Sequence, residues 1–241
     1  MTAMKRPKYS WVFPVYNESK SLPTLINEIK NVMKDKTYEI LAVDDGSVDQ
    51  SQEVLRYIQK KLPQLHILPL GTHEGKWVAL GIGIEAARGD IVVTIDSDLQ
   101  DNPNELTKLL IKLNEGYDIV SGWRKIRVDQ TYKVFISQLG NWCVSLLTGK
   151  KFYDLNTSFK VYRQQMIHHI PLHGSLLRFS LLFAKNLGFK VIEIPIVHRP
   201  RIWGSSKFGF IKYIRILYDL LLVLLLFSGS GALRNIKKHR L

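Results

Sequence analysis

The run IVVTIDSDLQ, at residues 91–100, constrains the fold more than any other stretch of the chain. Five β-branched residues stand in succession from Ile91 to Ile95, which predicts a buried strand. Two carboxylates, Asp96 and Asp98, follow where that strand should end, and on an extended segment they point the same way. Because like charges repel unless a cation lies between them, we expect a divalent ion there, Mg²⁺ or Mn²⁺, bridged to a nucleotide diphosphate. The alternative is a solvated turn with two acids and no metal.

Strand and helix patterns alternate along most of the chain. Apolar and β-branched runs predict strands at residues 10–15, 39–43, 66–70, 91–95, 118–122 and 191–197, with a short strand within 152–163. Apolar residues at helical spacing predict helices capped by Ser19 or Ser21 and by Asp49, and helices over residues 75–88, 103–115, 131–148 and 176–187. The fold class expected from this alternation is α/β, a mostly parallel sheet with flanking helices.

Three polar clusters follow expected strands: NES at residues 17–19, DDGS at 44–47 and DSDLQ at 96–100. In open parallel sheets, ligands bind beyond the carboxyl ends of the strands. The three clusters therefore predict one ligand site at one rim of the sheet.

Two motifs resemble phosphate-binding loops and are interpreted as packing features. GIGIEA at residues 81–86 matches a dinucleotide-binding pattern, but it lies inside an expected helix, where its glycines cannot form a phosphate loop. Gly75 and Lys76 look like the end of a P-loop, but Trp77 replaces the required Ser or Thr and position 70 is Leu.

Composition sets the broad class. The chain has 241 residues, enough for one large α/β domain with a sizeable core, and 46% of them are hydrophobic. The single cysteine, Cys143, excludes an internal disulfide and favours a reducing compartment. A net charge of +13 predicts an anionic partner: a nucleotide, a nucleic acid or an anionic membrane surface. The short apolar stretch after the basic N-terminus is interrupted by Pro14, so no signal peptide is expected.

Seven motifs together resemble family 2 glycosyltransferases with the GT-A fold, and within them the polyprenyl-phosphate glycosyltransferases related to dolichyl-phosphate mannose synthase. The resemblance covers roughly residues 10–225. The matching motifs are FPVYNE (13–18), VDDGSVD (43–49), GKWVAL (75–80), ARGDIVVTIDSDLQDNP (87–103), DIVSGWR (118–124), DLNTSFKVYR (154–163) and RIWGSSKFG (201–209).

The resemblance implies two sets of binding residues. Those for the donor nucleotide line the base and ribose pocket, contact the nucleoside or hold the phosphates: Pro14, Tyr16, Glu18, Val43, Asp45, Asp96, Ser97, Arg201 and Lys207. Those for the metal, Mg²⁺ or Mn²⁺, are Asp96, Asp98 and Gln100. Simpler interpretations stay open, since Pro14 can merely end a strand and Tyr16 can be half-buried packing.

The same resemblance implies the residues closest to the reaction. Asp98, Arg124 and Asp154 are the expected catalytic residues, with Asp154 near the transferred sugar or the acceptor. Ser158 and Arg163 are expected near the acceptor phosphate, although Arg163 can instead be a surface cation. The seven histidines have no metal-ligand spacing and are assigned no role.

This chain departs from the family pattern at two positions. Relatives usually carry Asn where Gly81 stands, and Arg where Lys160 stands. Lysine keeps the charge of arginine but loses its bidentate phosphate geometry.

The end of the chain predicts membrane contact. We expect a catalytic domain at residues 1–207, an apolar helix at 208–227 and a basic tail at 228–241. Only about eight residues of that helix are free of polar groups, against the roughly 20 that span a bilayer. An amphipathic helix followed by cations suits peripheral attachment to the cytoplasmic face of an anionic membrane. Packing in a core or on a membrane-embedded partner subunit is the alternative.

Three functions follow as expectations. The first is inverting transfer of a sugar from a UDP- or GDP-sugar to a polyprenyl phosphate, undecaprenyl or dolichyl. The second is transfer to a saccharide or protein hydroxyl. The third is a non-enzymatic basic binding protein, although no basic motif interleaved with aromatic residues is present, so no nucleic-acid partner is expected.

Overall fold

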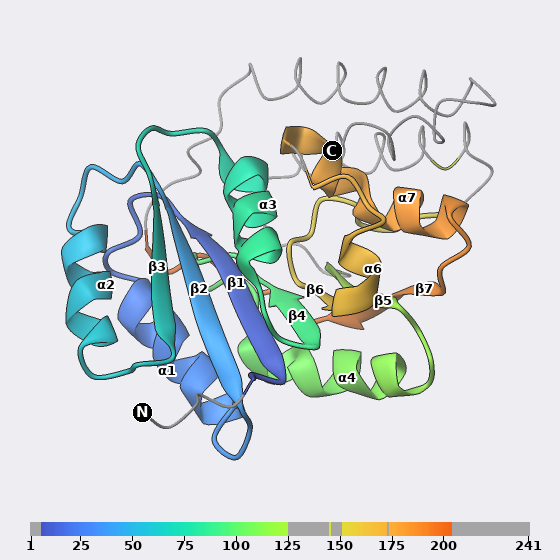
Figure 1. The fold of residues 1–241 in the computed structure, drawn as a ribbon, viewed down its shortest axis with the longest axis horizontal. Helices are drawn as coiled ribbons and strands as arrows, with labels where there is room; N and C mark the ends of the chain where they lie inside the picture. Colours follow the sequence, from blue (N-terminus) through green and yellow to red (C-terminus); the bar gives the residue numbers. More distant parts are fainter. Residues whose placement is uncertain (1–5, 125–144, 146–150, 173, 204–241) are drawn as a thin grey trace.

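The computed structural model of the protein describes residues 6–124, 145, 151–172 and 174–203. Within them, a seven-stranded sheet has the strand order β3-β2-β1-β4-β6-β5-β7 (Figure 1). The strands are β1 (Tyr9–Val15), β2 (Tyr38–Asp45), β3 (Leu65–Leu70), β4 (Ile91–Thr94), β5 (Ile119–Arg124), β6 (Lys160–Arg163) and β7 (Val191–Ile196). All pairings are parallel except those of β6, which runs antiparallel to both β4 and β5. The mostly parallel α/β sheet expected from the sequence is confirmed.

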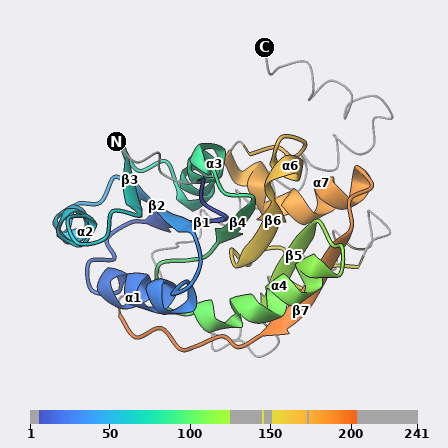
Figure 2. The same cartoon turned by 60° about the horizontal axis from the view of Figure 1, so that its bottom comes forward.

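Helices form a layer on each face of this sheet. The α-helices are α1 (Leu22–Val32), α2 (Ser51–Gln59), α3 (Lys76–Ala86), α4 (Leu106–Asn114), α6 (Gln164–Ile167) and α7 (Ser180–Asn186), with 3₁₀ turns η1 (Pro103–Glu105) and η2 (Gly174–Phe179). Figure 2 shows α1 and α4 on one side of the sheet and α3, α6 and α7 on the other. Among the described residues, the helices lack the length and apolar character of a membrane-spanning segment.

Two hydrophobic cores result, one on each face. Along β1 the side chains alternate, so Trp11 and Phe13 pack in the core beneath α1 and α4, while Val12 packs in the core beneath α3. All three side chains are fully buried, as the central strand of a two-faced parallel sheet requires.

Most helix boundaries match the expectation, with three corrections. The helix expected over residues 103–115 begins as the 3₁₀ turn η1, and α4 starts only at Leu106. Ser21 precedes α1 as expected, but its hydroxyl donates to the Glu18 carbonyl oxygen and caps no amide. The helix expected over residues 176–187 begins as the 3₁₀ turn η2, and only Ser180–Asn186 is α-helical. In η2 the side chains of Leu177 and Arg178 are buried, and η2 packs against α3, so tertiary contacts override the local helical pattern there. The helix expected at 131–148 and the segments 208–227 and 228–241 lie outside the described residues.

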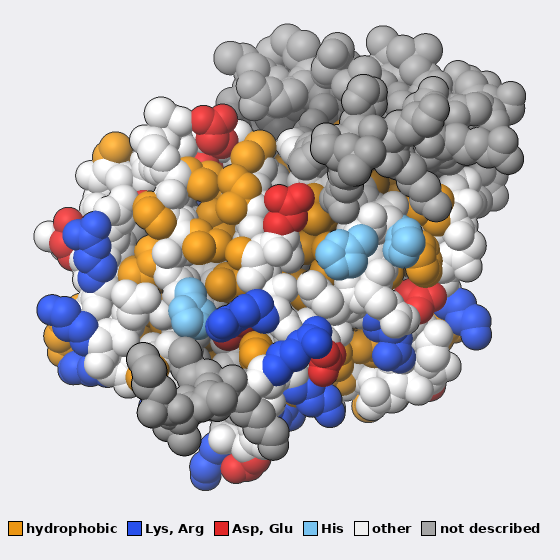
Figure 3. Space-filling view, in the orientation of Figure 1, with side chains coloured by type: hydrophobic (Ala, Val, Ile, Leu, Met, Phe, Trp, Pro, Cys, Tyr) orange, Lys and Arg blue, Asp and Glu red, His pale blue; other side chains and the backbone are white. Residues whose placement is uncertain are grey.

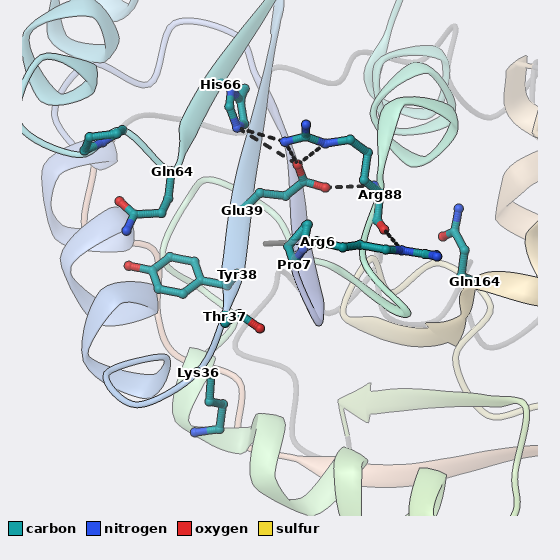
Figure 4. A pocket seen from close by; sticks show the side chains of 11 residues that line it. Arg6, Pro7, Lys36, Thr37, Tyr38, Glu39, Gln64, His66, Arg88 and Gln164 are labelled. Carbon is teal, nitrogen blue, oxygen red and sulfur yellow. Dashed lines mark hydrogen bonds and ion pairs between the residues drawn. The ribbon is translucent and has the colours of Figure 1, made fainter. Parts of the chain in front are cut away.

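The rim formed by the starts of the parallel strands carries an ion-pair network. There a cavity of about 730 Å³ is lined by Arg6, Lys36 and Arg88 together with Glu39, and basic side chains gather below the middle of the same face in Figure 3. The Glu39 carboxylate accepts a hydrogen bond from the Ser10 hydroxyl (2.6 Å). It also accepts one from the Arg88 guanidinium (2.6 Å), as Figure 4 shows. Burial alone would raise the pKa of Glu39, but these donors hold it below its ordinary value. The network fastens β1 and β2 to the turn after α3, at the end of the sheet opposite Asp96.

Candidate active site

The acidic motif at residues 96–100 follows strand β4 and lies at the rim formed by the carboxyl ends of the central strands. The strand ends at Thr94, and the Ser97 hydroxyl donates to the Pro14 carbonyl oxygen (2.7 Å), which ties the acidic loop to the end of β1. Leu99 has φ +65°, a conformation that L-residues rarely adopt, while its side chain is buried in the core. Core packing therefore holds the loop in a shape that turns Asp96 and Asp98 toward the rim.

Each of these two carboxylates, Asp96 and Asp98, forms an ion pair with a basic side chain. The Lys76 ammonium lies 2.6 Å from Asp96 Oδ2. The Arg201 guanidinium donates to Asp98 Oδ2 and lies 3.6 Å from Glu18 Oε1. The structure thus brings three expected site residues, Asp98, Glu18 and Arg201, into one cluster.

Burial sets the protonation of the acidic loop. Burial and the neighbouring Asp96 charge raise the pKa of Asp98 to about 6. Burial and the same neighbour raise the pKa of Asp101 to about 7. Asp96 behaves in the opposite way: burial alone would raise its pKa, but the Lys76 ammonium, the Ser158 hydroxyl and the Arg124 charge together lower it. Acids crowded together in this way are typical of a site that holds a cation or a proton.

The donor set fits a divalent ion that shares its coordination with a substrate. No group of three or more His, Cys, Asp or Glu side chains has metal-binding geometry within the described ranges. The two carboxylates Asp96 and Asp98 match a Mg²⁺ or Mn²⁺ ion that takes its remaining ligands from phosphate and water. Asp101 Oδ1 is buried with no hydrogen-bond partner among the described residues, which is a further oxygen donor in the same loop. Gln100, the expected third ligand, points its amide nitrogen toward the Arg199 carbonyl oxygen (3.5 Å).

Arg124 and Asp154 form a buried bidentate pair. Arg124 Nε lies 2.7 Å from Asp154 Oδ2, and Arg124 Nη2 lies 3.1 Å from Asp154 Oδ1. Although burial opposes it, the Asp154 carboxylate raises the pKa of Arg124. Glu193 on β7 holds the Asp154 turn from behind, because its two oxygens accept the backbone N–H groups of Tyr153 (2.9 Å) and Asp154 (2.8 Å). The Asp154 carboxylate therefore fixes Arg124 at the end of β5, and the Glu193 carboxylate fixes Asp154.

The residues expected around the nucleoside lie at the ends of β1 and β2. Tyr16 stacks on His73 with ring centroids 3.9 Å apart, and His73 Nδ1 lies 2.9 Å from Asp45 Oδ2. The Asp45 carboxylate also accepts the backbone N–H groups of Glu74 (2.7 Å) and Gly75 (3.0 Å), so it anchors the loop before α3. Val43 is fully buried against that helix.

A second set of cations surrounds the Trp77 ring in the first turn of α3. Lys76 Nζ lies 5.0 Å from the ring centroid, while Lys160 Nζ and the Arg178 guanidinium carbon each lie 5.6 Å from it. Lys160 is 1% exposed, and burial lowers its pKa to about 7. Ser158 is buried beside Asp96.

One expected position is corrected. Arg163 pairs with Ile91 at the start of β4, a full strand length from the acidic loop, because β6 runs antiparallel to β4. There it donates to the carbonyl oxygens of Tyr117 (3.1 Å) and Leu113 (2.6 Å) and fixes the end of α4, so the expectation that it lies near an acceptor phosphate is wrong. Lys207 lies outside the described residues.

The sequence analysis missed three residues of this cluster: Lys76, His73 and Glu193. The motif GKWVAL already contained Lys76, but comparison with a P-loop led away from it. The other two had no local signal, because each acts on a residue at least 28 positions away in the chain, Asp45 for His73 and Asp154 for Glu193.

This chain is similar to known proteins over most of its length. The family model "Glycosyl transferase family 2" matches residues 10–183. Undecaprenyl-phosphate 4-deoxy-4-formamido-L-arabinose transferases from Enterobacter sp. (strain 638) and Photorhabdus laumondii are 37% and 34% identical, over 88% and 89% of this chain. The chain spans about two thirds of the length of these relatives, 66% and 67%.

Solved structures agree on the fold. Glucosyl-3-phosphoglycerate synthase from Mycobacterium tuberculosis, crystallised with Mn²⁺, UDP and phosphoglyceric acid, has a TM-score of 0.70 to this chain at 18% sequence identity. The match covers 90% of this chain and 78% of that one. The fold is thus the GT-A fold of nucleotide-sugar-dependent transferases. Within that class, the chain belongs to glycosyl transferase family 2.

Proposed function

We propose that this protein transfers a sugar from a nucleotide-diphosphate sugar to a polyprenyl phosphate at a membrane surface. The observation that carries the proposal is the convergence at one rim of two carboxylates, Asp96 and Asp98, with the cations Lys76, Arg124 and Arg201. Oxygen donors beside cations are what a metal-bound diphosphate requires. Relatives named as undecaprenyl-phosphate transferases support the choice of acceptor.

The residues of the rim divide into three roles in this proposal. Asp96 and Asp98, with Gln100, hold Mg²⁺ or Mn²⁺, which when bound supplies positive charge to the departing diphosphate. Pro14, Tyr16, Glu18, Val43, Asp45 and Ser97 shape the donor pocket. Arg124, Arg201 and Lys207 bind phosphate oxygens.

The acceptor explains why the site needs no strong base. A phosphate monoester has a second pKa of about 6, so at neutral pH its oxygen is already anionic. That oxygen attacks the anomeric carbon while the bond from this carbon to the diphosphate oxygen breaks, and the configuration at carbon inverts. Asp154 has both oxygens on Arg124, so it positions this arginine rather than removing a proton.

Location follows from the substrate. A polyprenyl phosphate is anchored in a bilayer, so the enzyme acts peripherally on the cytoplasmic face of a membrane. The basic tail at residues 228–241 attaches it to anionic lipid, directly or through a membrane-embedded partner subunit.

The test is an assay of the purified chain with UDP- and GDP-sugars, Mn²⁺ or Mg²⁺, and either undecaprenyl phosphate or a free sugar as acceptor. We expect transfer to the lipid phosphate only, abolished by EDTA and reduced at least about a hundredfold in Asp98→Ala. Glu115→Ala, which removes a carboxylate from the surface end of α4, should keep full activity. Transfer to the free sugar alone, or full activity in Asp98→Ala, would overturn the proposal.

A further inference from the structure

Both carboxylates assigned to the metal are occupied by the protein's own cations. The Lys76 ammonium lies 2.6 Å from Asp96, and both side chains are 22% exposed. Arg201 forms the same kind of ion pair with Asp98, and the two side chains are 24% and 12% exposed, respectively. A divalent ion cannot take the same oxygens until these cations leave, because an ammonium at this distance both blocks the oxygen and repels the ion.

The side chain of Lys76 can change its position while its backbone stays anchored. Its peptide follows Gly75, whose N–H is held by the buried Asp45 carboxylate, so the first turn of α3 is anchored. Gly75 has φ +101°, a conformation open to glycine, and this sharp turn starts the helix at Lys76. Beyond the anchored backbone, the lysine stem is flexible and its head is a compact point charge. The face of Trp77, 5.0 Å away, offers the ammonium a second contact.

Charge balance indicates where the ammonium goes. In the structure, the negative charges of Asp96 and Asp98 are balanced by Lys76 and Arg201. A divalent ion alone would leave an excess of positive charge, and a sugar diphosphate alone, with one negative charge on each phosphate, would leave an excess of negative charge. Only the two together restore neutrality, with the ion on the carboxylates and the displaced cations on the phosphate oxygens.

We propose that Lys76 exchanges partners during the catalytic cycle: it neutralises Asp96 in the empty site and binds the donor diphosphate in the loaded site. This exchange makes metal and sugar nucleotide bind cooperatively, and it weakens the binding of the metal alone. The inference rests on the proposed function, since it requires Asp96 and Asp98 to be metal ligands.

The exchange gives Lys76→Met opposite effects on two affinities. Without the ammonium, Mn²⁺ alone should bind about tenfold more tightly, because its competitor is gone. UDP in saturating Mn²⁺ should bind about tenfold more weakly, because a phosphate contact is lost. The factor by which UDP tightens Mn²⁺ binding should therefore fall at least about fivefold. A lysine that is merely structural would weaken both affinities or neither.

The experiment counts free Mn²⁺ by its electron paramagnetic resonance signal, with and without UDP, and repeats the titration with GDP. Lys76→Arg, which keeps the charge, should bind Mn²⁺ alone as the wild type does. Lys108→Met is the matched control, because it breaks an ion pair of similar length with the buried Glu105 (2.7 Å) and should leave both affinities unchanged. Thermal unfolding of each variant checks that it is folded.

The outcomes separate the two proposals. Unchanged or weaker Mn²⁺ binding in folded Lys76→Met, with a wild type that binds metal and nucleotide, would overturn the exchange and leave the proposed function standing. A wild type that binds neither Mn²⁺ nor either nucleotide would overturn the proposed function, and the exchange with it.

Discussion

At the scale of single residues, Lys160 holds a buried positive charge in the site region that lowers the stability of the fold. Its side chain is 1% exposed, and its ammonium has one long hydrogen bond within the described residues, 3.4 Å to the Leu155 carbonyl oxygen. Burial lowers the pKa of Lys160 to about 7, from an ordinary value of 10.5. The charges of Asp154 and Glu193 offset this burial only in part, so the ammonium destabilises the fold.

Removing this charge should stabilise the protein. We expect Lys160→Met to raise the free energy of unfolding at neutral pH and below, because folding there must bury a proton that the unfolded chain holds more tightly. Between about pH 7 and about pH 10.5 only the unfolded chain keeps this proton, so wild-type stability rises with pH and the advantage of the variant shrinks. Urea unfolding at several pH values across this window measures the difference. An advantage that stays constant or grows with pH would contradict the assignment.

Residue positions could be predicted where the residues lie in a recognisable motif. Asp96, Asp98 and Arg124 were found this way, and the structure places all three at the same rim. Lys76 was missed because its place in the site depends on its partner, Asp96. This partner lies 20 positions away in the chain and comes close only when α3 and β4 pack together. Arg163 was misplaced because a motif does not reveal the direction of the strand that carries it.

At the scale of elements, α3 is held against its neighbours by two glycines. A Cβ atom on Gly83 would lie 2.3 Å from Val12 Cγ1, and one on Gly81 would lie 2.2 Å from the Leu172 carbonyl oxygen. The interpretation of GIGIEA as a packing motif inside a helix is thus confirmed. Gly81 lets the chain before η2 approach this helix closely.

Gly81→Ala should therefore destabilise the protein, although alanine favours helix by about 1 kcal/mol over glycine. The added methyl meets a backbone carbonyl that cannot rotate away, and overpacking of this kind costs about 1–3 kcal/mol beyond the helix gain. The midpoint of urea unfolding should fall. Gly71→Ala is the matched control, because no atom lies within 4 Å of its added Cβ, and its midpoint should stay near that of the wild type. Equal midpoints for the two variants would refute the close-packing argument.

Elements were easier to predict than their ends. Periodicity located the strands and the helices α1 to α4, because their buried faces repeat in the sequence. The 3₁₀ start of the segment at Gly174–Phe179 could not be predicted this way, since contact with α3, far away in the sequence, determines it.

At the scale of the whole molecule, charge is the dominant property. The net charge of +13 is spread over the chain, and on the face drawn in Figure 3 basic side chains gather below the middle, with others near the edges. The layered α/β fold followed from alternation alone. The strand order did not, because the position of β6 between β4 and β5 depends on pairings between distant segments.

The full chain should bind anionic bilayers through this charge. We expect it to sediment with vesicles that contain phosphatidylglycerol and to stay in solution with pure phosphatidylcholine, because each basic residue near an anionic surface contributes about 1 kcal/mol. Salt at about 0.5 M should release much of it, since screening shortens the reach of the charges. Equal sedimentation with both vesicle types, unaffected by salt, would show that charge does not drive attachment.

The reversed direction of β6 has a consequence for how such a chain can diversify. At the rim of the candidate site, the parallel strands β1, β2 and β4 present the residues that follow them, whereas the antiparallel strand β6 presents the residues that precede it, the stretch from Asp154 to Ser158. Under the proposed function, substitutions in the stretch before β6 should alter catalysis, whereas substitutions just after β6 should alter only the stability of the fold. Under the proposed function, the choice of sugar or acceptor can therefore change through this one short segment, without disturbing the helix α6 that follows β6.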